Sequence, residues 1–166
     1  RFQEDIKATY GADDFLEKPF RLSELARRAR ILLERKHGDG GIPTGDIPVS
    51  VRECYNNGVR LAREGKTAEA AEEFLKGLAI DPFTYRLHHG LAIVHQQTGE
   101  LYQAMGEYER TVELKPGFFP ALKNLAVIYQ QKGFRNKALE TWERAMNAAP
   151  DEPTRKAIRE HVIKLL

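Results

Sequence analysis

The sequence predicts an all-α protein built as a solenoid of helical hairpins, and three observations support that prediction. Residues of a few kinds return at a fixed interval through most of the 166-residue chain, which is the mark of a repeat architecture. Between these returning residues, apolar side chains stand three and four positions apart, as in an amphipathic helix. Glycine and proline fall where one helix would end and the next begin. Together these observations predict pairs of helices stacked one after another.

Five columns of residues keep a step of 34 through three copies of the repeat. Pro82, Pro116 and Pro150 show this step most simply (116 − 82 and 150 − 116). The other columns hold a glycine, an alanine, an aromatic and a small residue: Gly65, Gly99 and Gly133; Ala70, Ala104 and Ala138; Phe74, Tyr108 and Trp142; Gly58, Ala92 and Ala126. Five columns in register indicate one structural unit repeated three times.

Each column has a physical role in a hairpin of two helices. The glycine ends the first helix because it can take positive φ at a helix C-terminus. In the second helix, the alanine lets the two backbones approach and the aromatic residue fills the space beside it, as Ala70 and Phe74 do in the first unit. Proline closes the unit because it suits the first turn of the next helix. Ser50 and Glu53 have the spacing of a capping box, so we expect the first helix to begin at Ser50.

This 34-residue pattern resembles the tetratricopeptide repeat (TPR), and the resemblance implies TPR-type hairpins wound into a right-handed superhelix. It covers residues 51–150 as three repeats, at 51–84, 85–118 and 119–152. The third repeat follows the family pattern at eight positions: Leu125, Ala126, Tyr129, Gly133, Ala138, Trp142, Ala145 and Pro150. The first two depart from it at five positions: Asn57, Gly77, His88, His95 and Thr111. Residues 153–166 are expected to form a capping helix that covers the last repeat with Ile158, Val162 and Leu165.

The opening stretch of the chain has a different character. The run GADDFLEKPF, followed by RLSELARRARILLER, resembles the C-terminal end of the receiver domain of bacterial response regulators. The resemblance covers residues 1–35 and implies a helix, a short strand and a second helix. In that family the lysine of a Lys-Pro pair reaches the phosphoryl group, an aromatic residue three positions earlier is a switch side chain, and the peptide bond before the proline is commonly cis. Lys18, Phe15 and Pro19 match those three positions.

The receiver-like stretch lacks the acids on which receiver chemistry depends. In the family, the phosphoacceptor aspartate and the Mg²⁺-binding acids lie on upstream strands, and Asp13 and Asp14 do not match them. We therefore expect no phosphorylation of this chain and interpret Lys18 as an exposed lysine beside a turn proline. The stretch itself is interpreted as the tail of a longer receiver. Residues 36–50, rich in glycine and proline, are predicted to be a linker.

Composition and motifs argue against several classes of function. A net charge of +2, from 26 basic and 24 acidic residues, is unlike that of a dedicated nucleic-acid binder. A single cysteine, Cys54, excludes an internal disulfide and fits a cytoplasmic protein. The sequence has no apolar run near the roughly 20 residues that cross a bilayer, so we expect no membrane association. It also offers no nucleophile with its base, no phosphate-binding glycine loop and no zinc spacing, so we expect neither catalysis nor a cofactor.

Two histidines of the second repeat are poor candidates for a metal site. His88 and His95 would lie about 10.5 Å apart along a helix axis, which is too far to share one metal ion. Both occupy packing columns of the repeat, so we interpret them as partly buried core residues.

The resemblance to TPR proteins also predicts where a partner would bind. In that family the first helix of each unit lines a concave groove that commonly holds an extended peptide or a partner helix. The corresponding outward positions here are Arg52, Tyr55, Asn56, Val59, Arg86, His89, Ile93, Lys123, Asn124, Val127 and Gln131, and Gln97 and Gln130 extend the same row. Cationic, amide and apolar groups are mixed among them, so an acidic or C-terminal segment is the expected ligand. The alternative for each of these residues is an ordinary solvated side chain.

One TPR subtype clamps a C-terminal carboxylate with a lysine and an asparagine in its first unit and an asparagine in its second. Here Tyr55, Val59 and Gly90 stand at those positions. We therefore do not expect a clamp of that kind.

The sequence as a whole predicts a bacterial signalling adaptor of the two-component type: a TPR scaffold that binds another protein and does not catalyse a reaction. Self-association would use the receiver-like stretch. The alternative is that the TPR array is the output module of a phosphorylatable response regulator whose phosphoacceptor half lies outside this chain. The acids upstream of Arg1 in the coding sequence would distinguish the two.

Overall fold

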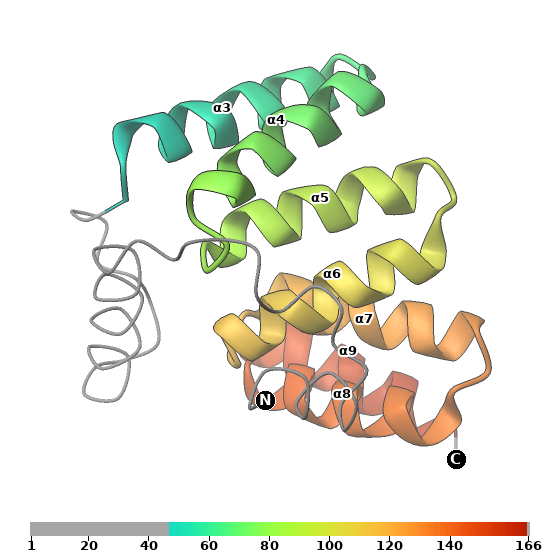
Figure 1. The fold of residues 1–166 in the computed structure, drawn as a ribbon. Helices are drawn as coiled ribbons and strands as arrows, with labels where there is room; N and C mark the ends of the chain where they lie inside the picture. Colours follow the sequence, from blue (N-terminus) through green and yellow to red (C-terminus); the bar gives the residue numbers. More distant parts are fainter. Residues whose placement is uncertain (1–46, 166) are drawn as a thin grey trace, which may run out of the picture. The chain divides into compact units, whose positions relative to one another are not determined.

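The structure is a computed structural model that describes residues 47–165, and all of the secondary structure in this part of the chain is helical (Figure 1). The helices are α3 (Val49–Arg63), α4 (Thr67–Ile80), α5 (Tyr85–Gln97), α6 (Leu101–Leu114), α7 (Phe119–Gln131), α8 (Arg135–Asn147) and α9 (Glu152–Ile163). The all-α prediction is therefore confirmed for the described residues. The receiver-like positions Phe15, Lys18 and Pro19, and the elements expected within residues 1–35, lie outside them.

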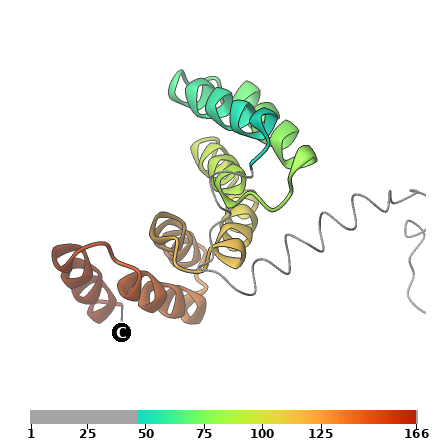
Figure 2. The same ribbon diagram turned by 90° about the vertical axis from the view of Figure 1, so that its left-hand side faces the viewer.

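The helices pair as three hairpins, α3 with α4, α5 with α6 and α7 with α8, which follow one another in chain order (Figures 1 and 2). The turn inside each hairpin contains the repeated glycine, and Gly65, Gly99 and Gly133 have φ values of 77°, 80° and 79°. In the first turn the amide of Lys66 donates to the carbonyl of Leu61 (3.0 Å) and that of Gly65 to Ala62 (3.2 Å). The other two turns repeat this pair of bonds, which defines a Schellman motif. The predicted role of the glycine column is confirmed.

The start of the first helix differs from the prediction. Helix α3 begins at Val49, and its N-terminus has no side-chain capping bond. The prediction of a capping box at Ser50 and Glu53 is therefore wrong. The carbonyl of Pro48 instead accepts from the amides of Val51 (2.9 Å) and Arg52 (3.1 Å). Pro48 is the N-cap residue, and its ring already fixes φ near the helical value, which favours the start of a helix at this point. Ser50 is therefore the second residue of the helix.

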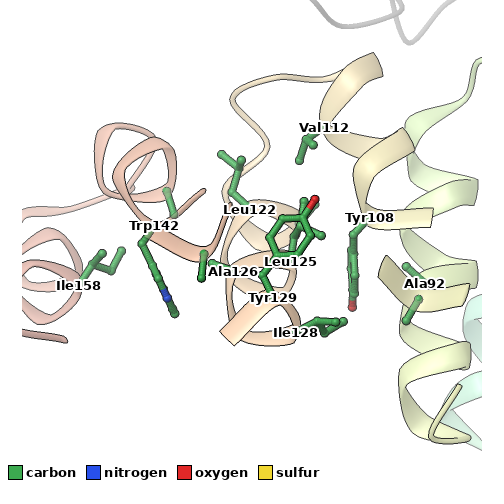
Figure 3. Packing of buried hydrophobic residues seen from close by; sticks show 14 of the residues in the cluster. Ala92, Tyr108, Val112, Leu122, Leu125, Ala126, Ile128, Tyr129, Trp142 and Ile158 are labelled. Atoms are coloured by element: carbon green, nitrogen blue, oxygen red, sulfur yellow. The ribbon is translucent and has the colours of Figure 1, made fainter. Parts of the chain in front are cut away.

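The buried side chains form two clusters. The smaller one joins α3, α4 and α5 around Phe74, Leu87 and Leu91. The larger one runs from α5 to α9 around Tyr108, Leu125 and Trp142 (Figure 3). The alanine column is buried throughout, at 0% exposure for Ala70 and Ala104 and 2% for Ala138, so the helices of each hairpin can pack closely.

The last helix packs against the third hairpin through one face. Ile158 of α9 is buried in the larger cluster, and Val162 and Leu165 are partly buried against it. Figure 3 shows Ile158 beside Trp142 of α8. The carboxylate of Asp151 caps α9 by accepting from the amide of Thr154 (2.8 Å), and this bond lowers the pKa of the carboxyl group.

Candidate functional site

Helices α3 and α5 form an apolar pocket of about 280 Å³. Val59 and Ile93 contribute aliphatic walls, Tyr55 an aromatic one, and Phe74 of α4 also lines the pocket. The remaining lining residues are Ala62, Arg63, His89, Gly90 and Gln97. Four of the predicted groove residues, from two different hairpins, therefore meet at one hollow: Tyr55, Val59, His89 and Ile93.

Two glycines leave room for the ring of Phe74 at this pocket. A Cβ atom at Gly58 would lie 2.6 Å from Phe74 Cε1, and one at Gly90 would lie 2.5 Å from Phe74 Cζ. Both distances are below any normal contact between carbon atoms. A side chain at residue 90 would therefore displace Phe74 or itself enter the pocket, since Gly90 and Phe74 both line it.

The contact between the second and third hairpins contains polar groups at the positions that correspond to Phe74 and Gly90. Tyr108 and Asn124 stand one repeat after Phe74 and Gly90, 34 residues further on. The amide of Asn124 donates to the Tyr108 hydroxyl (2.9 Å), which in turn donates to Gln96 Oε1 (2.8 Å). Asn124, predicted as a groove residue, therefore already uses its amide nitrogen within the protein.

Of the described residues that line the apolar pocket, the one with a permanent charge is cationic. Arg63 lines it, and no acidic residue does. Arg52 and Arg86 are exposed on the same two helices. The guanidinium of Arg86 donates to the Tyr85 hydroxyl (3.3 Å) and lies 5.9 Å from the centre of that ring. The site thus combines apolar walls with positive charge.

His89 is more enclosed than an outward position would suggest. Its ring lies edge-on to Phe118, with 4.9 Å between ring centres, and 5.9 Å from Tyr108. Its Nε2 atom is buried and has no hydrogen-bond partner. Burial lowers the pKa of His89 to about 4, so the ring is neutral at neutral pH and adds no charge to the pocket wall.

The other predicted groove residues are not part of this pocket. Val127 is half-buried and packs against the larger cluster. Asn56 lines an adjoining hollow of about 520 Å³ along α3, which shares Tyr55, Val59 and Arg63 with the pocket and also includes Arg60 and Glu64. Lys123 and Gln131 are exposed on α7.

Sequence reasoning missed four lining residues, Ala62, Arg63, Phe74 and Gly90. A signal for Arg63 was present, because it stands 34 residues before Gln97 and 68 before Gln131 in one column. Phe74 was interpreted only as a filler between the two helices of its hairpin, and it does pack there with 1% of its surface exposed.

His88 and His95 of the second repeat have carboxylate partners. His88 Nδ1 lies 2.6 Å from Glu107 Oε2, and its Nε2 lies 3.0 Å from the carbonyl of Pro82. His95 Nδ1 lies 2.5 Å from Glu100 Oε2. Both histidines are half-buried. Among residues 47–165, no group of three or more His, Cys, Asp and Glu side chains is gathered as a metal site.

The described helices include none with the length and apolar character of a membrane span.

Comparison with known proteins finds similar structures but no similar sequences: no protein-family model matches the chain, and no curated protein does. The type III secretion chaperone SycD of Yersinia enterocolitica, in complex with a peptide of the translocator YopD, superposes with a TM-score of 0.62 at 19% identity, covering 72% of this chain and 91% of SycD. PcrH, a Pseudomonas aeruginosa protein, in complex with the chaperone binding region of PopB, gives 0.59 at 20% identity, covering 76% and 98%.

A third similar structure is the first TPR of Spaghetti (RPAP3) bound to the HSP90 peptide SRMEEVD. Its TM-score is 0.60 at 17% identity, over 69% of this chain and 94% of that one. Identities this low carry information about the fold alone. Together with the hairpins, the glycine turns and the alanine column described above, they establish that this chain has a TPR-like fold.

Proposed function

We propose that this chain is a protein-interaction module without catalytic activity, and that it binds an extended segment of another protein along α3, α5 and α7. The observation that carries this proposal is the apolar pocket between α3 and α5, where residues of two hairpins meet beside exposed arginines. The similar structures support it, because SycD, PcrH and the RPAP3 domain are each seen with a peptide or region of another protein.

The proposed partner segment is acidic and carries apolar side chains. Arg52, Arg86 and Lys123 are exposed on three successive first helices, so a segment that runs along the array would meet one cation on each. Val59, Ile93 and Val127 are half-buried on the same helices and would anchor its apolar residues. In such interfaces exposed charges mainly set the association rate and salt dependence, whereas buried anchors supply more of the affinity.

Recognition of a C-terminal carboxylate by the known clamp is not part of this proposal. The clamp positions hold Tyr55, Val59 and Gly90, which provide neither a lysine ammonium nor an asparagine amide.

Affinity capture with the full chain as bait, followed by titration of the captured partner, tests the proposal. Lys123→Glu should weaken binding and reduce its salt dependence, because it replaces attraction by repulsion within a Debye length of about 8 Å. Lys156→Glu on α9 is the matched control, since Lys156 is also exposed and its nearest acid, Glu160, is 4.0 Å away. Equal effects of the two variants, or a larger effect at Lys156, would refute binding along the first helices.

The receiver-like residues Phe15, Lys18 and Pro19 motivate a wider proposal about context. We propose that the module belongs to a cytoplasmic two-component signalling protein of bacteria, as an adaptor. The alternative is the output module of a complete response regulator. Upstream coding sequence with a phosphoacceptor aspartate and two further acids would favour the alternative, and coding sequence without them the adaptor.

A further inference from the structure

The pocket between α3 and α5 lies at two positions where the first pair of neighbouring hairpins differs in residue type from the second pair. At the junction of the second and third hairpins, the two columns hold Tyr108 and Asn124, which hydrogen-bond to each other. At the junction of the first and second hairpins, the same columns hold Phe74 and Gly90. Phe74 has no hydroxyl and Gly90 has no side-chain amide, so this junction cannot form the polar contact. It presents an apolar hollow instead.

The size of the hollow indicates what it can hold. Its volume of about 280 Å³ is just below the range of about 300–1,000 Å³ for sites that enclose a whole small molecule. One large apolar side chain of a bound segment is a better match. Such a side chain would contact Val59 and Ile93 on the walls and Phe74 below, all of them apolar.

The charges around the hollow indicate what should flank that side chain. Arg63 is part of the lining, Arg52 and Arg86 are exposed on the two helices that form it, and no carboxylate lines it. Glu64 lines the adjoining hollow, where its carboxylate is paired with Arg60 and Lys66. The neutral ring of His89 contributes no charge. An apolar residue with acidic neighbours would therefore place its side chain in the hollow and its carboxylates near the arginines.

We propose that this pocket is the specificity subsite of the module: it takes one large apolar side chain, flanked by Asp or Glu, from the partner segment, and Gly90 keeps it open. The inference rests on the proposed function, because it assigns one residue of the bound segment to one place along the helices. Burial of one such side chain favours binding substantially, so the pocket would decide which segments are selected.

A phage-displayed library of linear dodecapeptides, selected on the full chain, provides the probe. Selected peptides should share one large apolar residue next to acidic residues. A synthetic peptide of that sequence and its apolar→Ala analogue are then titrated against three proteins by fluorescence anisotropy. These are the wild type, the double variant Phe74→Tyr/Gly90→Asn, which copies the polar junction, and the control Gly106→Asn.

Gly106 is a matched control because it is a helical glycine, and a Cβ placed on it would meet no atom within 4 Å beyond its chain neighbours and the backbone of its own helix. The double variant should bind the selected peptide at least tenfold more weakly than the wild type, whereas Gly106→Asn should stay within twofold. The alanine analogue should lose at least tenfold against the wild type and less than threefold against the double variant, because the pocket is already closed there.

Circular dichroism checks that each variant folds. If the double variant does not, Val59→Gln and Ile93→Gln replace it, since both side chains are half-buried at the pocket and a polar group there removes the apolar wall without the clash at residue 90.

The experiment separates failure of the proposed function from failure of the pocket assignment. If the wild type selects no peptide family, the proposed function itself is refuted. If it selects peptides without a shared apolar residue, or if the double variant retains full affinity for the selected peptide, binding along the helices stands and the pocket assignment is wrong.

Discussion

Acidification should destabilise the protein through His89. Burial lowers the pKa of His89 to about 4, compared with 6.5 for an unperturbed histidine. Between these two values the unfolded chain binds a proton that the folded chain does not, so the stability falls as the pH falls. The contribution of the neutral ring is fully present above about pH 6.5, is lost progressively toward pH 4, and does not change further below it.

The size of this effect follows from the distance between the two pKa values. At about 1.4 kcal/mol for each pH unit between 6.5 and about 4, the full loss is about 3.5 kcal/mol. Solvent reaches part of the half-buried ring and screens its charge, so the loss in free energy of unfolding should lie between about 1.5 and 3 kcal/mol.

Urea denaturation of the wild type and of His89→Gln, each at pH 7.5 and pH 4.5, would measure this loss in free energy of unfolding. Every other titratable group is present in both proteins, so its contribution cancels in the difference between the two. On acidification the variant should lose at least about 1.5 kcal/mol less than the wild type. If both lose the same free energy, His89 is not held neutral by burial, and the interpretation of the pocket wall as uncharged fails with it.

Two further substitutions test the packing. Trp142→Ala should lower the free energy of unfolding in chemical denaturation by about 3–5 kcal/mol, because it removes a large buried side chain; a loss below about 1 kcal/mol would contradict the packing of α8. Gly58→Ala should lower the thermal midpoint, although Ala92 and Ala126 occupy its column. Its Cβ would lie 2.6 Å from Phe74, and overpacking of about 1–3 kcal/mol outweighs the roughly 1 kcal/mol that alanine gains in helix propensity. A raised midpoint would show that Phe74 moves aside freely.

The helices and turns could be predicted because their determinants are local. Gly65, Gly99 and Gly133 each act within one turn of chain, and the structure gives all three the expected positive φ. The start of α3 was predicted wrongly for a related reason. Two local signals competed there, and the proline at residue 48 prevailed over the serine at residue 50.

The pocket could not be predicted, because it depends on residues that are distant in sequence. Phe74 and Gly90 belong to different hairpins, and only the folded structure brings the ring to within 2.5 Å of a Cβ placed on residue 90. The enclosure of His89 has the same origin, since Phe118 comes from the loop that follows α6. A helical pattern indicates which side of a helix is exposed, but not which distant side chain covers it.

Because the core is divided into two clusters, binding at the pocket would stabilise one end of the array more than the other. The smaller cluster holds the first hairpin and part of α5, and in an array whose units touch only their neighbours, such an end can open while the rest stays folded. Phe74 belongs to this cluster and also lines the pocket. A segment bound there would hold the first hairpin closed, and its free energy of binding would add to the local stability of that end of the array. Binding at the pocket would then slow amide hydrogen exchange in α3 and α4, whereas exchange in α8 and α9 would stay unchanged.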